Sequence, residues 1–148
     1  MKFILTQELG RLAKWLRILG FDAEYFTEDK RSKLIILSLR EERVIITRSS
    51  ALSRFSGVRM IRVKSDFVEE QIRQVIRELG IKIDPGVFFR RCVICNIRLD
   101  GLSKEGAQGK VPEFVFKTQD LFMSCPSCKR VYWQGTHWTN ADNFVRGL

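Results

Sequence analysis

The four cysteines are the residues whose spacing most clearly indicates chemistry. They form two Cys-x-x-Cys motifs, Cys92–Cys95 and Cys125–Cys128. Each motif can make a tight turn, or knuckle, that directs two thiolates at one ion, and two knuckles supply the tetrahedral four-sulfur shell that suits zinc. Such a shell leaves no position open for water or substrate. We therefore expect a structural zinc site.

Other uses of these cysteines are two disulfides, four free buried thiols, or ligation of iron or an iron–sulfur cluster. Disulfides are rare in reducing compartments, and the sequence predicts a cytoplasmic protein. It has no apolar run of about 18 residues that could span a bilayer. Its N-terminal segment is interrupted by Arg11, Lys14 and Arg17, unlike the apolar region of a signal peptide. These observations favour metal over disulfides.

Residues 1–84 alternate between β-like runs and helical patterns, which predicts βαβ units and an open parallel sheet with flanking helices. The predicted strands are Lys2–Leu5, Ala23–Phe26, Val44–Thr47 and Arg59–Val63. The predicted helices are Glu8–Leu19, Ser32–Glu42, Ser50–Phe55 and Asp66–Leu79, the last with Asp66 as its N-cap.

The pattern breaks at Pro85-Gly86, a strong turn signal. We therefore predict an α/β domain at residues 1–85 and a small β-rich zinc-ribbon module at residues 86–148. Around the knuckles, strands are expected at Phe88–Arg91, Phe114–Phe116 and Val131–Trp133, with a polar loop at Gly101–Gly109.

Acidic side chains follow several of the predicted strands. Ligands of an open parallel sheet bind beyond the carboxyl ends of its strands, and metal-dependent phosphodiester cleavage needs several carboxylates around one or two divalent ions. The candidates are Glu8, Glu28, Asp29 and Asp66. Glu8 has an alternative place in the first turn of its helix, where a negative charge favours the dipole.

The chain is basic, with 26 Lys and Arg against 17 Asp and Glu and a net charge of +9. This excess favours a polyanionic partner, nucleic acid first and an anionic membrane surface second. On the first predicted helix, Arg11, Lys14 and Arg17 share the side opposite the leucines, with Trp15 beside them. That face could bind RNA, or it could be an ordinary solvated face.

Two further residues join these RNA-binding candidates. Arg48 follows the third predicted strand, and His137 stands beside Trp138 in the segment GTHW. His137 has no partner visible in the sequence that would make it a base, so it is expected either to pack beside Trp138 or to face a ligand.

Taken together, LGRLAKWLRILGFD, IITRS, the two knuckles and CPSCKRVYWQGTHW resemble the Mut-7 C-terminal RNase domain family, from Phe3 to Trp138. The resemblance implies a PIN-like fold followed by a zinc ribbon, and ribonuclease chemistry by carboxylates that hold Mg²⁺ or Mn²⁺. It also implies an Asp where this chain has Thr6, and another where it has Ser49. The acidic cluster after the second strand is kept as Glu28 and Asp29.

Hydroxyl groups do not supply the negative charge that Mg²⁺ or Mn²⁺ requires of its ligands. We therefore expect an RNA-binding protein with a degenerate nuclease site, weak or inactive, whose RNA is free or within a ribonucleoprotein. The alternative is an active Mg²⁺- or Mn²⁺-dependent ribonuclease with a rearranged carboxylate set. A third class is a protein–protein adaptor that uses the ribbon and its aromatic residues.

Overall fold

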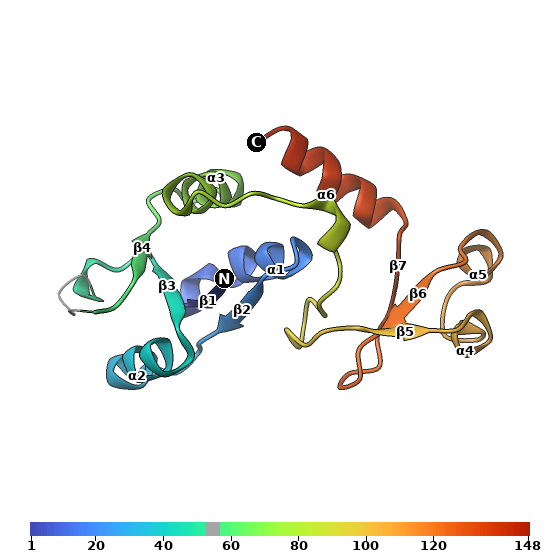
Figure 1. Cartoon of the computed structure of the whole chain (residues 1–148), viewed down its shortest axis with the longest axis horizontal. Helices are drawn as coiled ribbons and strands as arrows, with labels where there is room; N and C mark the ends of the chain where they lie inside the picture. The colour runs from blue at the N-terminus through green and yellow to red at the C-terminus, as the bar shows by residue number, and fades with distance from the viewer. Residues whose placement is uncertain (53–56) are drawn as a thin grey trace. The chain divides into compact units, whose positions relative to one another are not determined.

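The structure, a computed structural model, describes residues 1–52 and 57–148 (Figure 1). Their contacts form two compact units. The first comprises Met1–Leu16 and Phe21–Lys82, and the second comprises Arg17–Gly20 and Ile83–Leu148. That residues 1–85 and 86–148 are separate domains stays a prediction.

The first unit contains a parallel sheet in the order β2-β1-β3-β4. Its strands are β1 (Lys2–Leu5), β2 (Asp22–Tyr25), β3 (Arg43–Thr47) and β4 (Met60–Arg62). Its α-helices are α1 (Gly10–Ile18), α2 (Arg31–Glu41) and α3 (Val68–Leu79), and its 3₁₀ turns are η1 (Gln7–Leu9) and η2 (Ser50–Leu52). The predicted parallel sheet with flanking helices is confirmed.

Both faces of this sheet are covered, which explains why β1 and β3 read as continuous apolar runs. Figure 1 shows α1 and α3 on one side of the sheet and α2 on the other. On the α2 side, Ile4 and Ile45 pack with Phe26 and Leu34. Phe3 alternates with Ile4 along β1 and is also fully buried. The core thus holds the strand ends in place.

Most of the predicted bounds shift by one or two residues, and two of the differences change an assignment. α3 begins at Val68 with Phe67 at its N-cap, so the prediction of Asp66 as N-cap is wrong. Asp66 instead forms an ion pair with Arg48. Of the predicted helix Ser50–Phe55, residues Ser50–Leu52 form the 3₁₀ turn η2. Residues 53–56 lie outside the described part of the chain.

The second unit contains an antiparallel sheet in the order β5-β6-β7. Its strands are β5 (Asp100–Leu102), β6 (Phe122–Ser124) and β7 (Val131–Trp133). Its helical segments are η3 (Pro85–Val87), α4 (Lys104–Ala107), α5 (Glu113–Thr118) and α6 (Thr136–Arg146). This small β-rich unit with clustered cysteines fits the predicted ribbon.

Three local predictions for this unit are wrong. Phe114–Phe116 lies in α5 rather than in a strand, because the i,i+4 ion pair Glu113–Lys117 and the turn after Pro112 favour a helix. The expected loop 101–109 contains the end of β5 and α4, which Ser103 caps through the Gly106 N–H. The expected strand at 88–91 is reduced to one bridge, from Arg91 to Arg98.

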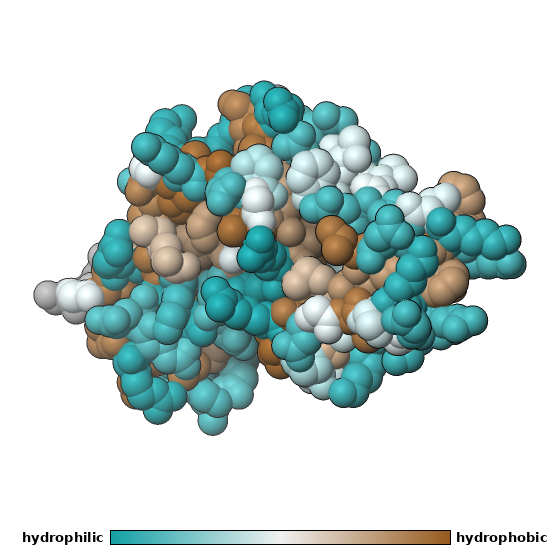
Figure 2. Space-filling view, turned by 45° about the vertical axis from the view of Figure 1, so that its right-hand side comes forward, coloured by the Kyte–Doolittle hydropathy of each residue, from teal (hydrophilic) through white to brown (hydrophobic). Residues whose placement is uncertain are grey.

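On the face that Figure 2 shows, apolar side chains are exposed among hydrophilic ones. The large exposed apolar residues include Ile36, Leu39, Phe67, Phe114 and Leu121. Among the described helices, none has the length and apolar character that crossing a membrane requires.

Candidate metal centre and strand-end site

The two knuckles have the same backbone geometry. In the first, Asn96 N–H donates to Cys92 O and Cys92 N–H donates to Ile97 O, both at 2.9 Å. In the second, Lys129 N–H donates to Cys125 O at 3.0 Å, and Cys125 N–H donates to Arg130 O at 2.9 Å. Asn96 and Lys129 both have positive φ, 60° and 66°, which closes each turn.

These turns bring four sulfur atoms together. The Sγ atoms of Cys92, Cys95, Cys125 and Cys128 all lie within 4.8 Å of one another. Backbone N–H groups point at the sulfurs, from Cys95 to Cys92 Sγ at 3.4 Å and from Cys128 to Cys125 Sγ at 3.5 Å. A closed shell of four converging thiols can hold a metal ion, and it fits the tetrahedral preference of zinc.

The pKa values of the two thiols of the first knuckle are shifted in opposite directions. Burial opposes ionisation of Cys92, but hydrogen bonds from Tyr132 and from backbone N–H groups outweigh it and lower the pKa to about 6. Partial burial and the neighbouring sulfurs raise the pKa of Cys95 to about 11. A positive charge nearby, such as a metal ion would supply, would favour the thiolate form of Cys95.

Two side chains outside the knuckles support this centre. The Tyr132 hydroxyl donates to Cys92 Sγ at 3.2 Å and accepts from Val93 N–H at 3.1 Å. Burial and its bond to Cys92 raise the pKa of Tyr132, so the phenol stays protonated. Arg17 Nη1 donates to the carbonyls of Val93 and Ile94, at 2.9 and 3.1 Å.

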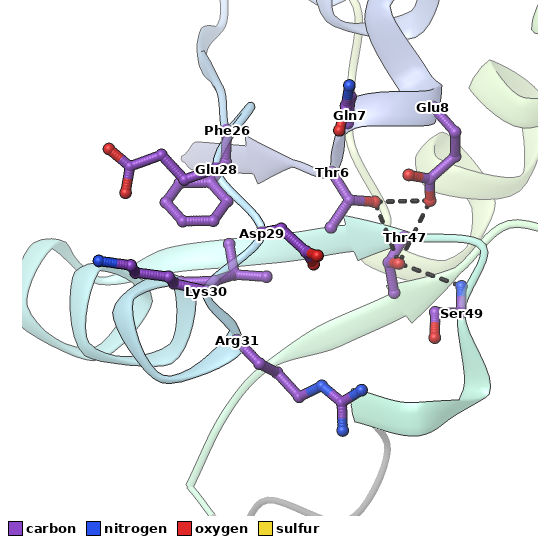
Figure 3. Close-up of a pocket in the computed structure, with 11 residues that line it drawn as sticks. Thr6, Gln7, Glu8, Phe26, Glu28, Asp29, Lys30, Arg31, Thr47 and Ser49 are labelled. Atoms are coloured by element: carbon purple, nitrogen blue, oxygen red, sulfur yellow. Dashed lines mark hydrogen bonds between the residues drawn. The ribbon is translucent and has the colours of Figure 1, made fainter.

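A second site lies at the carboxyl ends of β1 and β3. The Thr6 hydroxyl donates to Glu8 Oε1 at 2.6 Å and lies 3.1 Å from the Thr47 hydroxyl. Glu8 Oε1 also accepts from Arg48 N–H at 3.1 Å, and Ser49 N–H donates to Thr47 Oγ1 at 3.1 Å (Figure 3). Hydroxyl and amide groups thus hold one carboxylate where the two strands end.

The electrostatics of Glu8 follow from this network. Partial burial raises its pKa, but the hydrogen bonds from Thr6, from the backbone and from Thr47 outweigh burial and lower it below 4.5. Each of these bonds favours the charged form. Glu8 is therefore an ionised acceptor, and its Oε1 atom is already bonded within the protein.

The network borders a pocket of about 220 Å³. Its charged and polar lining residues are Thr6, Gln7, Glu8, Glu28, Asp29, Lys30, Arg31, Thr47 and Ser49. In Figure 3 the Asp29 carboxylate points toward Thr6 and Thr47, whereas the Glu28 carboxylate points away from them. Glu28 pairs with Lys33 at 2.7 Å.

The four acidic candidates are not gathered in one place. Glu8, Glu28 and Asp29 line the pocket, but Asp66 is not among its lining residues and pairs with Arg48. Within residues 1–52 and 57–148, the four cysteines are the only group of three or more metal-ligating side chains whose ligand atoms lie within 4.8 Å of one another. The catalytic assignment of these acids stays a prediction.

The RNA-binding candidates have different surroundings. Arg11, Lys14 and Arg48 are exposed. Arg17 is only 7% exposed, so its expected place on the exposed face of the first helix is wrong: its guanidinium serves the knuckle instead. Trp15 is half-buried, and His137 is exposed in the first turn of α6.

Comparison with known proteins bears on this combination of sheet and ribbon. Residues 1–145 match the Mut7-C RNAse domain family. The chain belongs to the Mut7-C RNAse domain family. No curated protein and no solved structure gives a significant match. Family membership indicates a ribonuclease-like protein, with RNA as the substrate or partner.

Sequence reasoning missed two residues of these sites in this Mut7-C RNAse domain chain, Thr47 and Tyr132, and gave Arg17 a different place. Thr47 is predicted only as the last residue of an apolar strand. Its side chain is 0% exposed, and its hydroxyl is bonded to that of Thr6. Tyr132 lies close to the second knuckle but bonds to the first. Arg17 has the helical spacing of an exposed cation. Only its place in the last turn of α1 indicated a different role.

We expect the ribbon to bind one zinc ion per chain and to lose its fold without it, because metal binding and folding are coupled in a unit this small. Cys128→Ser should abolish stoichiometric zinc and the near-ultraviolet circular dichroism of the ribbon's aromatic residues. Zinc uptake near pH 7 should release protons, since the pKa of Cys95 is raised. Elemental analysis, dichroism and pH measurement during titration test this.

Ser127→Ala is the matched control, because it changes an exposed side chain in the same knuckle without removing a sulfur. Full zinc content and an intact ribbon in Cys128→Ser would contradict the four-sulfur site.

Thr6→Val should raise the pKa of Glu8, because it removes the hydroxyl that donates to the carboxylate. In the native chain the stabilisation from Glu8 is present above pH 4.5 and is lost as the pH falls through its lowered folded-state pKa. The mutant should lose less stability on acidification over that range. Carboxyl chemical shifts followed by NMR across pH 2–7 measure the change.

Thr27→Val, a substitution of an exposed threonine in the same unit, serves as control and should leave the Glu8 titration unchanged. An identical Glu8 titration in Thr6→Val and native protein would mean that the hydroxyl is not its donor in solution.

Proposed function

We propose that this chain is an RNA-binding protein of the Mut7-C RNAse domain family, with a weak or inactive nuclease site and a structural zinc ribbon. We expect it to act in the cytoplasm on RNA, free or within a ribonucleoprotein. The observation that carries the proposal is the hydroxyl pair Thr6 and Thr47, which bonds to Glu8 where a metal-dependent site needs carboxylates.

The chemistry of this end of the sheet argues against strong metal catalysis. Mg²⁺ and Mn²⁺ are held by anionic oxygens, and Thr6 and Ser49 carry none. Ser49 Oγ accepts from Ala51 N–H at 3.2 Å, so it serves the local turn. Glu8 Oε1 is occupied by internal donors. Any Mg²⁺ or Mn²⁺ bound here would rely chiefly on Asp29 and the other Glu8 oxygen, and activity would be weak.

Charge supports RNA as the partner. The net charge is +9, and Arg11 and Lys14 extend from α1 as exposed cations. Lys30 and Arg31 line the pocket beside Asp29. Phosphate contacts from such residues supply most of the affinity for nucleic acid without requiring catalysis. We infer that Arg48 and His137 add contacts of the same kind.

The second candidate function is an active Mg²⁺- or Mn²⁺-dependent ribonuclease that uses Glu8, Glu28, Asp29 and Asp66. It is favoured by the direction of the Asp29 side chain, which points into the pocket (Figure 3), and by the lowered pKa of Glu8. These two carboxylates could hold one ion, which would activate water and stabilise the leaving oxygen.

RNA affinity should fall steeply with added salt. Each phosphate contact contributes roughly 0.7–0.9 to the slope of log K against log salt. The double substitution Arg11→Gln and Lys14→Gln should therefore make the slope shallower by about 1.5. Fluorescence anisotropy with a labelled RNA hairpin at several salt concentrations measures this.

The matched control is Lys82→Gln with Lys110→Gln, which removes the same charge from two exposed lysines elsewhere. An equal change in that control would show that net charge alone matters. Absence of binding to the native chain at low salt would remove the RNA proposal.

Placing aspartates at positions 6 and 49 should increase ribonuclease activity. We expect Thr6→Asp with Ser49→Asp to cleave RNA in Mn²⁺ at least about tenfold faster than the native chain, because added carboxylates complete the ligand set. Thr6→Asn with Ser49→Asn, which has the same shape without charge, should show no gain. Gel-based cleavage assays with and without EDTA measure this.

The same assay decides between the two functions. Native activity that is abolished by Asp29→Asn would favour the active ribonuclease. Native inactivity together with RNA binding would favour the degenerate site.

A further inference from the structure

The second unit has a pocket that neither the metal centre nor the strand-end site uses. It has a volume of about 340 Å³. Aromatic and apolar side chains form most of its lining, from Phe88, Phe89, Leu121, Met123, Tyr132 and Trp133. Arg90 and Gln134, both exposed, are its charged and amide-bearing lining residues.

Three of its aromatic lining residues have a constrained backbone, a close approach to the backbone, or side-chain hydrogen bonds. Phe89 has φ +54°, a conformation that bulky residues rarely adopt, and its N–H donates to Ile18 O at 2.9 Å. A Cβ on Gly135 would lie 2.8 Å from Trp133 Nε1, so the absence of a side chain there lets the indole lie against the backbone. Tyr132 is fixed by its bonds to Cys92 and Val93.

The strained backbone at Phe89 is the feature that packing alone does not explain. A positive φ in a phenylalanine persists only where the surroundings hold it, and such outliers gather at binding sites. Phe89 is only half-buried, so its ring is not needed to fill the core. Fixed, partly exposed rings in a concave surface are the arrangement that stacks flat ligands.

We propose that this pocket binds an unpaired nucleobase of RNA. The inference rests on the proposed RNA-binding function and adds the feature of the RNA that is recognised. A base can stack on the Phe89 or Trp133 ring, whatever its identity. The Gln134 amide offers both a donor and an acceptor to a base edge, and Arg90 offers a cation to the adjoining phosphate.

The charge of this part of the chain favours a nucleobase over an apolar peptide. Residues 86–148 carry nine basic and five acidic side chains. Arg90 Nε donates to Gly86 O at 3.0 Å, which fixes the guanidinium beside the aromatic lining. An apolar peptide would gain nothing from that cation, whereas a nucleotide presents a base and a phosphate together.

The test compares RNAs and variants of the zinc-loaded full chain by fluorescence anisotropy. The probes are a labelled single-stranded RNA of about 12 nucleotides, the same strand with abasic residues, and a blunt duplex. The native chain should bind the single strand more tightly than the abasic strand or the duplex. Phe89→Gly removes the ring while suiting the positive φ, and should weaken binding of the single strand about 5- to 100-fold.

Two further variants keep the test decisive. Phe114→Ala removes an aromatic ring that is 75% exposed and outside the pocket, and should leave every affinity unchanged. Gln134→Ala alters an exposed lining residue that the fold does not need, and should weaken single-strand binding about fivefold. Zinc content and the thermal midpoint confirm that each variant is folded.

The outcomes separate this inference from the proposed function. RNA binding that does not distinguish the single strand from the abasic strand, and that Phe89→Gly and Gln134→Ala leave unchanged, overturns the nucleobase pocket alone. No binding to any RNA overturns both. A native dimer that Phe89→Gly converts to a monomer at unchanged RNA affinity would show that a second copy fills the pocket, and would also overturn it.

Discussion

Four sulfur atoms within 4.8 Å of one another set the main constraint on this protein, because thiolates this close repel one another unless a cation binds between them. The buried side chains around them are few: Cys92 and Cys125 belong with Leu99 to the apolar cluster of the second unit. A metal ion bound there would stabilise this unit as a larger hydrophobic core does in other domains. The hydrogen bonds of Arg17 and Tyr132, which end on the first knuckle, depend on the same geometry.

The strand-end site obeys a different rule, that buried polar groups must find partners. Thr47 is 0% exposed, so its hydroxyl has to be bonded within the protein. Thr6 and Thr47 solve this by bonding to each other and to Glu8. These hydrogen bonds order the ends of β1 and β3 around one carboxylate.

Much of the fold could be predicted because its signals are local. β1 has the bounds that its apolar run indicates, and the two Cys-x-x-Cys spacings specify the knuckles. The errors have both local and distant causes. Phe114–Phe116 is a short apolar run that suits a strand, but the i,i+4 pair Glu113–Lys117 favours the helix α5. Burial of Arg17 depends on carbonyls 76 residues away, which no helical wheel can reveal.

The last turn of α1 has a consequence for how such a chain can evolve. By their contacts, residues 17–20 belong to the second unit: Arg17 bonds to the knuckle, and a Cβ on Gly20 would lie 2.7 Å from Val87 O. Deleting everything after residue 82 would remove the carbonyls to which Arg17 donates and the backbone that lies against Gly20. The ribbon is therefore not a cassette that recombination at a linker could add or remove cleanly. Gain or loss of the ribbon would also require substitutions at residues 17–20 of the same chain.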